Sequence, residues 1–341
     1  MVLMKRRLLL IFLLPVLAFC FGSCSFAPSG DLKELDSWAR GTDKLKVLST
    51  TAMIGDLASE IGGDRVSHIT LINGEVDPHN YELIRGDDEK FILADLIFAN
   101  GLGLEHGASL THWLGSHENV VTLGDAIMEK APNDILYVGG ELDPHLWMDV
   151  SLWAKAVDPI VSALSKSDPD GSVEYRKRGS ELKKRMHKVD GDIAQNLSQV
   201  PSEKRYLVTS HDAFNYFSKR YLATPAERAN GKWRMRFVAP EGLSPDGQLG
   251  PQDIQYVTDY LCMRNISVVF PESNLSSDAL RKIVDSCRLR GHHVIISNRP
   301  LYGDAMGQVP SYGESCRYLN VMLANCNALV EEWRDANGSG D

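Results

Sequence analysis

The amino-acid sequence predicts an α/β protein with two lobes, each a mostly parallel sheet flanked by helices, joined by one long backbone helix. Patterns typical of short strands and amphipathic helices alternate between residues 46 and 123, and a second alternating series begins at residue 206. Strands that alternate with helices predict βαβ units and parallel sheets. Between the two series, residues 174–197 are rich in Lys, Arg, Glu and Gln, which predicts a long polar helix.

The first series combines short strands with helices. Strands are predicted at residues 46–50, 66–72, 96–99 and 120–123, and helices at 52–61, 87–94, 104–114 and 150–165. The first of these helices stops at Gly62 and Gly63, because glycine favours helix ends. These alternating elements predict one complete α/β lobe.

The long helix carries one narrow apolar stripe. Its members recur at three- and four-residue steps: Leu182, Met186, Val189, Ile193 and Leu197. A single stripe predicts a helix that is buried along one side only. Such a helix fits a spine laid along two lobes, and an ordinary surface helix fits the pattern equally well.

The second series has the same alternation. Strands are predicted at residues 206–209, 267–271 and 293–297, and helices through Phe214, Phe217 and Tyr221 and over residues 253–263, 279–290 and 314–333. Residues 223–251 contain several Gly and Pro and are predicted to be irregular. The chain then divides into a signal peptide (1–23), a tether (24–44), an N-terminal lobe (45–168), a linking helix (169–200), a C-terminal lobe (201–335) and a tail (336–341).

The N-terminus predicts export. Three basic residues precede an apolar run over residues 8–21, which is the layout of a secretory signal and is too short to span a membrane. Gly22, Ser23 and Cys24 then resemble a bacterial lipobox, although Phe21 stands where leucine is usual. We expect an exported, periplasmic or extracytoplasmic protein that is lipid-anchored at Cys24. A plain cleaved signal peptide is the alternative.

Charge and cysteine content narrow the class of protein further. The net charge of −9 argues against nucleic-acid binding, for which basic patches supply the affinity. Four cysteines follow Cys24 in the chain: Cys262, Cys287, Cys316 and Cys326. An even number in an exported protein permits two disulfides, whose pairing cannot be read from the sequence.

Two matched motifs place histidines in stiff turns. Residues 77–82 read Asp-Pro-His-Asn-Tyr-Glu, and residues 143–149 read Asp-Pro-His-Leu-Trp-Met-Asp. Proline restricts both its own backbone and that of the residue before it. His79 and His145 are therefore presented from pre-organised turns, as metal ligands require, and nearby carboxylates could orient their rings. A capped turn without ligand is the alternative for each.

Three further residues lie near the ends of predicted strands in the second series. His211 follows the strand over 206–209, Asp304 follows the strand over 293–297, and Glu272 follows Phe270. Open α/β sheets bind ligands at the carboxyl ends of their strands. His211 is thus a third candidate ligand and Glu272 a candidate for orienting a histidine. Asp304 taken alone is better explained as a helix cap.

Other motifs complete a recognisable set. Residues 100–105 read Asn-Gly-Leu-Gly-Leu-Glu, residues 209–214 Thr-Ser-His-Asp-Ala-Phe, and residues 304–307 Asp-Ala-Met-Gly. Together with the two repeats, and in this order, they resemble the metal-specific class of ABC-transporter solute-binding lipoproteins, the zinc- and manganese-binding family. In that family the metal lies between two lobes joined by a long helix. The resemblance implies four metal ligands, namely His79, His145, His211 and Asp304.

The resemblance also implies a function. One divalent transition-metal ion (Zn, Mn or Fe) would be captured by a monomer and delivered to an ABC-transporter permease. Three imidazoles and one carboxylate suit tetrahedral zinc, and intrinsic affinity favours zinc over manganese and iron. Residues 125–141 contain no histidine, whereas zinc-specific members often carry a His-rich loop, so the metal stays open. Histidine ligands must be neutral, and binding is expected to weaken as pH falls through about 6.

Two alternative functions and some unexplained residues remain. A metal-dependent hydrolase would need an open coordination position and a base, and the chain has no His-Glu-x-x-His motif, so we expect no enzyme. A surface adhesin with the same fold is the other alternative. Residues 226–248 look longer and more basic than the resemblance implies and receive no function. Surface or core roles are predicted for His106 and His112.

Overall fold

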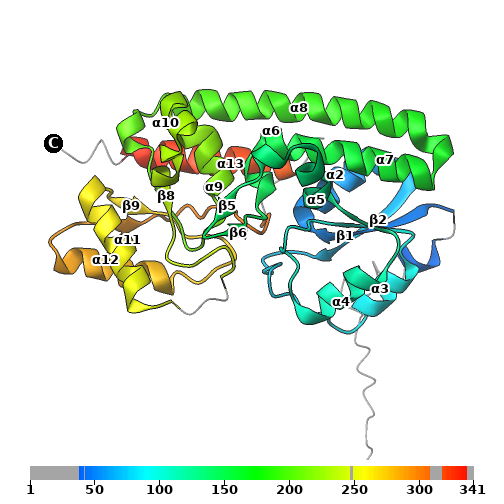
Figure 1. Cartoon of the computed structure of the whole chain (residues 1–341), viewed down its shortest axis with the longest axis horizontal. Coiled ribbons are helices and arrows are strands. Elements are labelled where there is room, and N and C mark those ends of the chain that lie inside the picture. The colour runs from blue at the N-terminus through cyan, green and yellow to red at the C-terminus, as the bar shows by residue number, and fades with distance from the viewer. Residues whose placement is uncertain (1–37, 42, 246–248, 308–316, 336–341) are drawn as a thin grey trace, which may run out of the picture.

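The computed structural model describes residues 38–41, 43–245, 249–307 and 317–335. Two α/β lobes lie side by side beneath a layer of helices (Figure 1). The longest of these, α8 (Ser172–Ser198), runs over both lobes, with α7 (Val157–Ser167) and α13 (Arg317–Asp335) packed against it. The predicted two-lobed α/β architecture with a long connecting helix is confirmed.

Some sequence predictions concern residues outside the described part of the chain. The signal peptide, Cys24, most of the tether, Cys316 and the tail all belong to this group. Within the described ranges, no helix combines the length and the apolar character needed to cross a membrane.

The first lobe is built on a parallel sheet with the strand order β2-β1-β3-β4. Its strands are β1 (Leu45–Thr51), β2 (Val66–Ile72), β3 (Leu96–Ala99) and β4 (Val120–Thr122), each within one residue of its predicted bounds. Helix α2 (Ala52–Gly62) packs on the sheet between it and α8, and α3 (Asp87–Leu93) lies on the opposite side (Figure 1). Buried apolar residues fill both sides of the sheet.

The first lobe differs from prediction in three places. Helix α4 (Ala108–Ser116) begins later than residue 104, because the buried Glu105 carboxylate accepts hydrogen bonds from Thr50 Oγ1 and the Asn100 N–H and holds a loop there. The predicted helix 150–165 is split into α6 (Val150–Trp153) and α7 by a 3₁₀ turn. Helix α5 (Leu123–Lys130) and the hairpin β5 (Tyr137–Val138)–β6 (Glu141–Leu142) were not predicted.

Helix α8 connects the lobes through side chains as well as along the chain. Four members of its predicted apolar stripe are fully buried, namely Leu182, Met186, Ile193 and Leu197. The fifth member, Val189, is partly buried. Arg178 donates to the Gly62 carbonyl at the end of α2 in the first lobe. Asp190, also buried, accepts hydrogen bonds from Arg220 Nε and the Tyr221 hydroxyl in the second lobe. The helix therefore packs as a spine rather than as an ordinary surface helix.

The second lobe has very short strands. Two parallel pairs, β7–β8 and β9–β10, are joined by a hydrogen bond of 2.9 Å from the Phe270 N–H to the Val208 carbonyl. The elements are β7 (Leu207–Val208), α9 (Asn215–Phe217), α10 (Pro225–Asn230), β8 (Phe237–Val238), α11 (Pro251–Arg264), β9 (Val268–Val269), α12 (Asp278–Leu289) and β10 (Ile295–Ile296). The prediction of irregular structure over 223–251 was wrong where α10 and β8 form.

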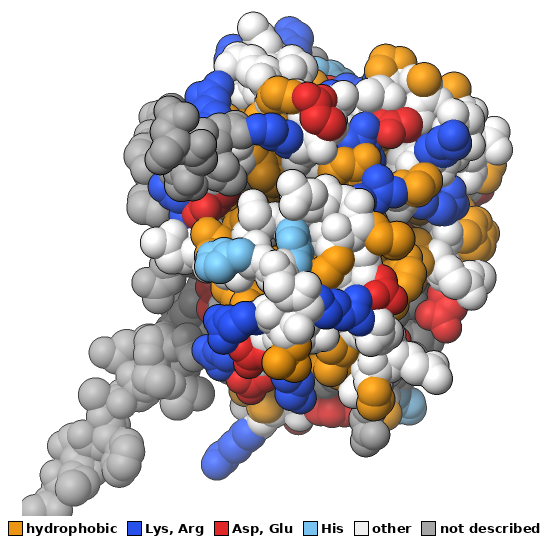
Figure 2. Space-filling view, turned by 90° about the vertical axis from the view of Figure 1, so that its left-hand side faces the viewer, with side chains coloured by type: hydrophobic (Ala, Val, Ile, Leu, Met, Phe, Trp, Pro, Cys, Tyr) orange, Lys and Arg blue, Asp and Glu red, His pale blue; other side chains and the backbone are white. Residues whose placement is uncertain are grey.

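On the end face of the second lobe, the described side chains form no patch of a single charge (Figure 2). At the end of the molecule that this lobe forms, Lys and Arg side chains are interspersed with Asp and Glu (Figure 2). Among the described cysteines, Cys262, Cys287 and Cys326 are free thiols.

Candidate metal centre

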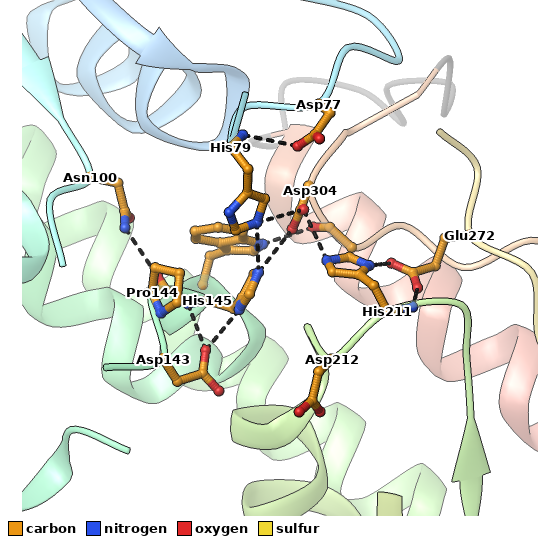
Figure 3. A network of polar contacts seen from close by, with 12 residues as sticks. Asp77, His79, Asn100, Asp143, Pro144, His145, His211, Asp212, Glu272 and Asp304 are labelled. Atoms are coloured by element: carbon orange, nitrogen blue, oxygen red, sulfur yellow. Dashed lines mark hydrogen bonds and ion pairs between the residues drawn. The ribbon is translucent and has the colours of Figure 1, made fainter. Parts of the chain in front are cut away.

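Four side chains from separate loops meet between the two lobes (Figure 3). They are the four candidates from the sequence, His79, His145, His211 and Asp304, and one ligand atom from each lies within 4.8 Å of the others. None is more than 4% exposed. His211 Nε2 and both Asp304 oxygens have no hydrogen-bond partner. They lie only at ion-pair distance: His211 Nε2 is 3.0 Å from Asp304 Oδ2, and Asp304 Oδ1 is 3.4 Å from His145 Nε2. Unsatisfied buried polar atoms are uncommon, and a cation would supply the missing partner.

The two Asp-Pro-His motifs form the same local turn. In each, the aspartate accepts a hydrogen bond from the histidine N–H two residues on, at 2.9 Å for Asp77 and 3.0 Å for Asp143. Aspartate commonly caps its own backbone in this way. The repeated motif thus presents His79 and His145 from matching turns, with their Nε2 atoms 3.2 Å apart.

His145 is held more firmly than His79. Asp143 Oδ1 lies 2.7 Å from His145 Nδ1, and both side chains are fully buried. The Asn100 side chain donates to the carbonyl of Pro144, which ties the loop over residues 100–105 to the second repeat. A carboxylate on Nδ1 fixes the tautomer with a proton there and leaves Nε2 as the electron-pair donor.

His211 has an equivalent partner in Glu272. This carboxylate accepts from the Ser210 and His211 N–H groups through Oε1, and its Oε2 lies 2.7 Å from His211 Nδ1. The short strands β7 and β9 run side by side, so the loops at their carboxyl ends bring the two residues together. Glu272 therefore contacts the His211 ring at Nδ1, while Asp304 faces its Nε2, which is the position expected of a residue that orients a histidine ligand.

Asp304 completes the cluster from the loop after β10. Its Oδ2 lies 3.0 Å from His211 Nε2 and 3.2 Å from His79 Nε2, and its Oδ1 lies 3.4 Å from His145 Nε2. The loop lies so close to its neighbours that a Cβ added to Gly303 would be 2.5 Å from Glu272 Oε2. Asp304 thus faces all three histidines instead of capping a helix.

Burial and charge act in opposite directions on this cluster. Burial alone would lower the pKa of His211, but the negative charges of Glu272 and Asp304 outweigh it and raise that pKa well above the usual value. For Asp304, burial alone would raise the pKa, and the charges of His211 and His145 instead bring it well below the usual value. Without a metal ion, a proton on His211 balances the Asp304 carboxylate. A divalent cation can replace that proton.

Several contacts across the lobes surround the cluster. Trp147 Nε1 donates to the Gly303 carbonyl at 2.8 Å, and the Tyr318 hydroxyl donates to the Trp147 carbonyl at 2.6 Å. Farther out, Ser273 Oγ donates to Glu75 Oε2 at 2.7 Å. The first-lobe and second-lobe ligands are therefore held in one closed arrangement.

Sequence reasoning missed some residues around the site. The carboxylates at the end of each repeat do not contact the histidine rings. Glu82 accepts hydrogen bonds from backbone N–H groups at the start of α4, and Asp149 caps α6. The aspartate that opens the second repeat, Asp143, is the one that contacts a histidine ring, a role that its place two residues before His145 could have suggested. His106 is exposed, in agreement with the predicted surface or core role, and its ring lies 5.6 Å from that of His79.

The fold and the cluster define a two-lobed binding protein with a buried transition-metal site at the junction of its lobes. The sequence profile of one family, described as zinc-uptake complex component A, periplasmic, matches residues 47–332. The chain belongs to this family of metal-binding components of ABC importers.

Individual relatives support the assignment. The chain is 42% identical over 290 residues to the metal-binding protein YtgA of Chlamydia trachomatis, covering 85% of this chain and 86% of that protein. It is 30% identical to the manganese ABC transporter substrate-binding lipoprotein PsaA of Streptococcus pneumoniae, covering 85% and 89%. The crystal structure of Fe(III)-bound YtgA from C. trachomatis superimposes with a TM-score of 0.79 at 39% identity, covering 85% of this chain and 98% of that one.

Proposed function

We propose that this protein captures a single divalent transition-metal ion between its lobes and delivers it to an ABC importer. The proposal rests above all on the convergence of four buried ligand atoms from four separate loops within 4.8 Å of one another. His79 and His145 would bind the ion from the first lobe, and His211 and Asp304 from the second. Both lobes then contribute to a single site, so binding the ion favours their closed arrangement.

The closed site favours a binding protein over an enzyme. A catalytic metal keeps one coordination position open for water or substrate. Here four protein ligands approach one point and are nearly inaccessible to solvent. We therefore infer that the ion is cargo and that the protein has no hydrolytic activity.

We infer that the protein works outside the cytoplasm as a lipid-anchored monomer, tethered through Cys24, and that its partner is the permease. The basic and apolar pattern before Cys24 supports the anchor. PsaA, which is similar over most of its length, is named as a lipoprotein of an ABC transporter. The anchor would keep the loaded protein close to the permease.

The identity of the metal is a separate question. The donor set suits zinc, and the family is named for zinc uptake. Similar proteins are named for manganese and for bound Fe(III). If Asp304 bound through both oxygens, the coordination number would rise to five, which also tolerates manganese and ferrous iron. We propose that zinc binds most tightly, because the intrinsic affinity order favours it.

Elemental analysis combined with native mass spectrometry tests the proposal. Protein from Ser25 onward, purified without chelators, should carry one metal ion per chain. The variants His79→Ala and His211→Ala should carry none, and His187→Ala, an exposed histidine of α8, should bind like the unaltered protein. A stoichiometry near zero, or full loading of the first two variants, would overturn the proposal. Competition among zinc, manganese and ferrous iron would then rank the metals.

A further inference from the structure

Two neighbouring helices of the second lobe carry a cysteine at matching positions. Cys262 lies in the last turn of α11, and Cys287 lies in the last turn of α12. The strands that follow these helices, β9 and β10, are parallel neighbours. Helices that lead into neighbouring parallel strands run in the same direction, so their ends lie at the same level of the lobe. The topology therefore places the two cysteines at one level.

The ends of the two helices are also held together. Helices α11 and α12 pack against each other (Figure 1). Arg290, directly after α12, forms an ion pair with Asp259 on the turn of α11 before Cys262. Farther along, His292 Nε2 lies 2.7 Å from the Ile266 carbonyl. These contacts fix the position of one helix end relative to the other, next to the cysteines.

The two thiols meet at this helix contact. Cys287 is fully buried and Cys262 is partly exposed, and both pack in the same apolar cluster of the lobe. Burial, and to a smaller extent contact with the Cys262 thiol, raises the pKa of the Cys287 thiol to about 11. A disulfide requires two cysteines that lie close together with their side chains directed at one another, and thiols in contact meet that requirement.

The third described cysteine lies apart from this pair. Cys326 is on α13, is fully buried, and has its Sγ 3.9 Å from the Ile193 carbonyl of α8. Burial raises the pKa of its thiol to about 12. Cys326 therefore serves as a reference thiol within the same chain.

We propose that Cys262 and Cys287 form a disulfide once the protein has left the cytoplasm, and that this bond cross-links the ends of α11 and α12. Both residues are free thiols in this structure, so the bond forms in the folded protein. The family is described as periplasmic, and disulfides form and persist in oxidising compartments of that kind. The inference depends on export and is independent of metal binding.

The oxidant is the disulfide of an extracytoplasmic thiol–disulfide oxidoreductase. Cys262 is the more accessible of the two, and its thiolate attacks that disulfide, which forms a mixed disulfide and displaces one thiolate of the oxidoreductase. Cys287 then loses its proton and attacks Cys262 Sγ, which closes the new bond and displaces the second thiolate. Two thiols of this protein are oxidised, one disulfide of the oxidoreductase is reduced to a dithiol, and both protons pass to the displaced thiolates.

The cross-link would act on the lobe that carries two residues of the metal centre. Strand β9 leads to Glu272, and strand β10 leads to the loop of Asp304. A disulfide stabilises a fold chiefly by restricting the unfolded chain. We therefore expect the oxidised protein to resist unfolding better than the reduced protein.

Peptide mapping after redox equilibration tests the pairing. Folded, reduced protein from Ser25 onward is incubated with reduced and oxidised glutathione at a series of ratios, with a chelator present to keep metal ions off the thiols. Free thiols are then alkylated in denaturant, and the protein is digested without reductant for mass spectrometry. The oxidised samples should yield a Cys262–Cys287 linked peptide pair, with Cys326 alkylated. Four alkylated cysteines at the most oxidising ratio, or a link to Cys316 or Cys326 in its place, would overturn the inference.

Urea unfolding of the oxidised and reduced forms tests the effect of the cross-link. Reduction should raise the equilibrium constant for unfolding by roughly 30- to 1000-fold. The double variant Cys262→Ser with Cys287→Ser should unfold like the reduced protein and be insensitive to reductant, whereas Cys326→Ser, the matched control, should keep its response. An unchanged unfolding curve after reduction of the bond would show that it does not stabilise the lobe, and would refute the cross-linking role.

Discussion

Replacing Glu272 by glutamine tests how the metal centre is oriented. The carboxylate accepts two hydrogen bonds on Oε1, from the Ser210 and His211 N–H groups at 3.1 and 2.9 Å, and its Oε2 lies 2.7 Å from His211 Nδ1. Glutamine has one acceptor oxygen and one donor NH₂ group. If its oxygen keeps the two backbone hydrogen bonds, its NH₂ faces Nδ1. His211 must then hold its proton on Nε2, the atom aimed at the metal.

The magnitude follows from that conflict. Removing a group that orients a metal-binding histidine costs roughly 10- to 100-fold in metal affinity. That range corresponds to about 1.4–2.7 kcal/mol. Water cannot soften the effect, because both side chains are fully buried. We therefore expect the zinc Kd of Glu272→Gln to rise by roughly one to two orders of magnitude.

Competition with a chelator of known affinity measures this Kd, and circular dichroism checks that the variant is folded. Asp143→Asn, which removes the partner of His145, should weaken binding to a similar extent. Glu89→Gln, an exposed carboxylate of α3, should leave the Kd unchanged. If folded Glu272→Gln bound zinc within threefold of the unaltered protein, the reasoning about the tautomer of His211 would be refuted.

Three further changes test other parts of the molecule. Glu75→Ala removes the contact with Ser273 across the lobes, and release of zinc into a chelator should accelerate roughly two- to fivefold, the worth of one modest hydrogen bond. Asp168→Asn removes the ion pair with Arg65. In the unaltered protein, the Arg65 guanidinium and the Tyr175 hydroxyl lower the pKa of Asp168 from 3.8 to about 2. Its contribution to stability is present above pH 3.8 and lost as pH falls through 2, so thermal melts should separate the variant from the unaltered protein near neutrality and converge in acid. Leu182→Ala empties a fully buried position on α8 and should cost about 2–5 kcal/mol in urea unfolding.

Each of these has a result that counts against it. Zinc release at the normal rate from Glu75→Ala would mean that this contact does not hold the lobes together. A melting difference for Asp168→Asn that persists at pH 2 would point to a cause other than the ion pair. A loss below 1 kcal/mol in Leu182→Ala would show that α8 can close over the cavity.

The sequence alone located most of the fold. Strands of the first lobe were predicted within one residue, because short apolar runs that are buried along most of their length leave strong local patterns. Short elements were the exceptions. The strand β8 has two residues within a Gly- and Pro-rich stretch, and its existence depends on pairing with β7. The late start of α4 depends on hydrogen bonds to the buried Glu105, which only the folded chain brings together.

The candidate site divides in the same way. His79 and His145 were predictable because a local rule, aspartate and proline stiffening a turn, acts within each repeat. Asp304 has no such signature, and its place among three histidines follows from the loop after β10 meeting the first lobe. His106 lies on a loop that the sequence suggested was helical. Local chemistry thus determines how each side chain is presented, whereas the closure of two lobes determines which side chains meet.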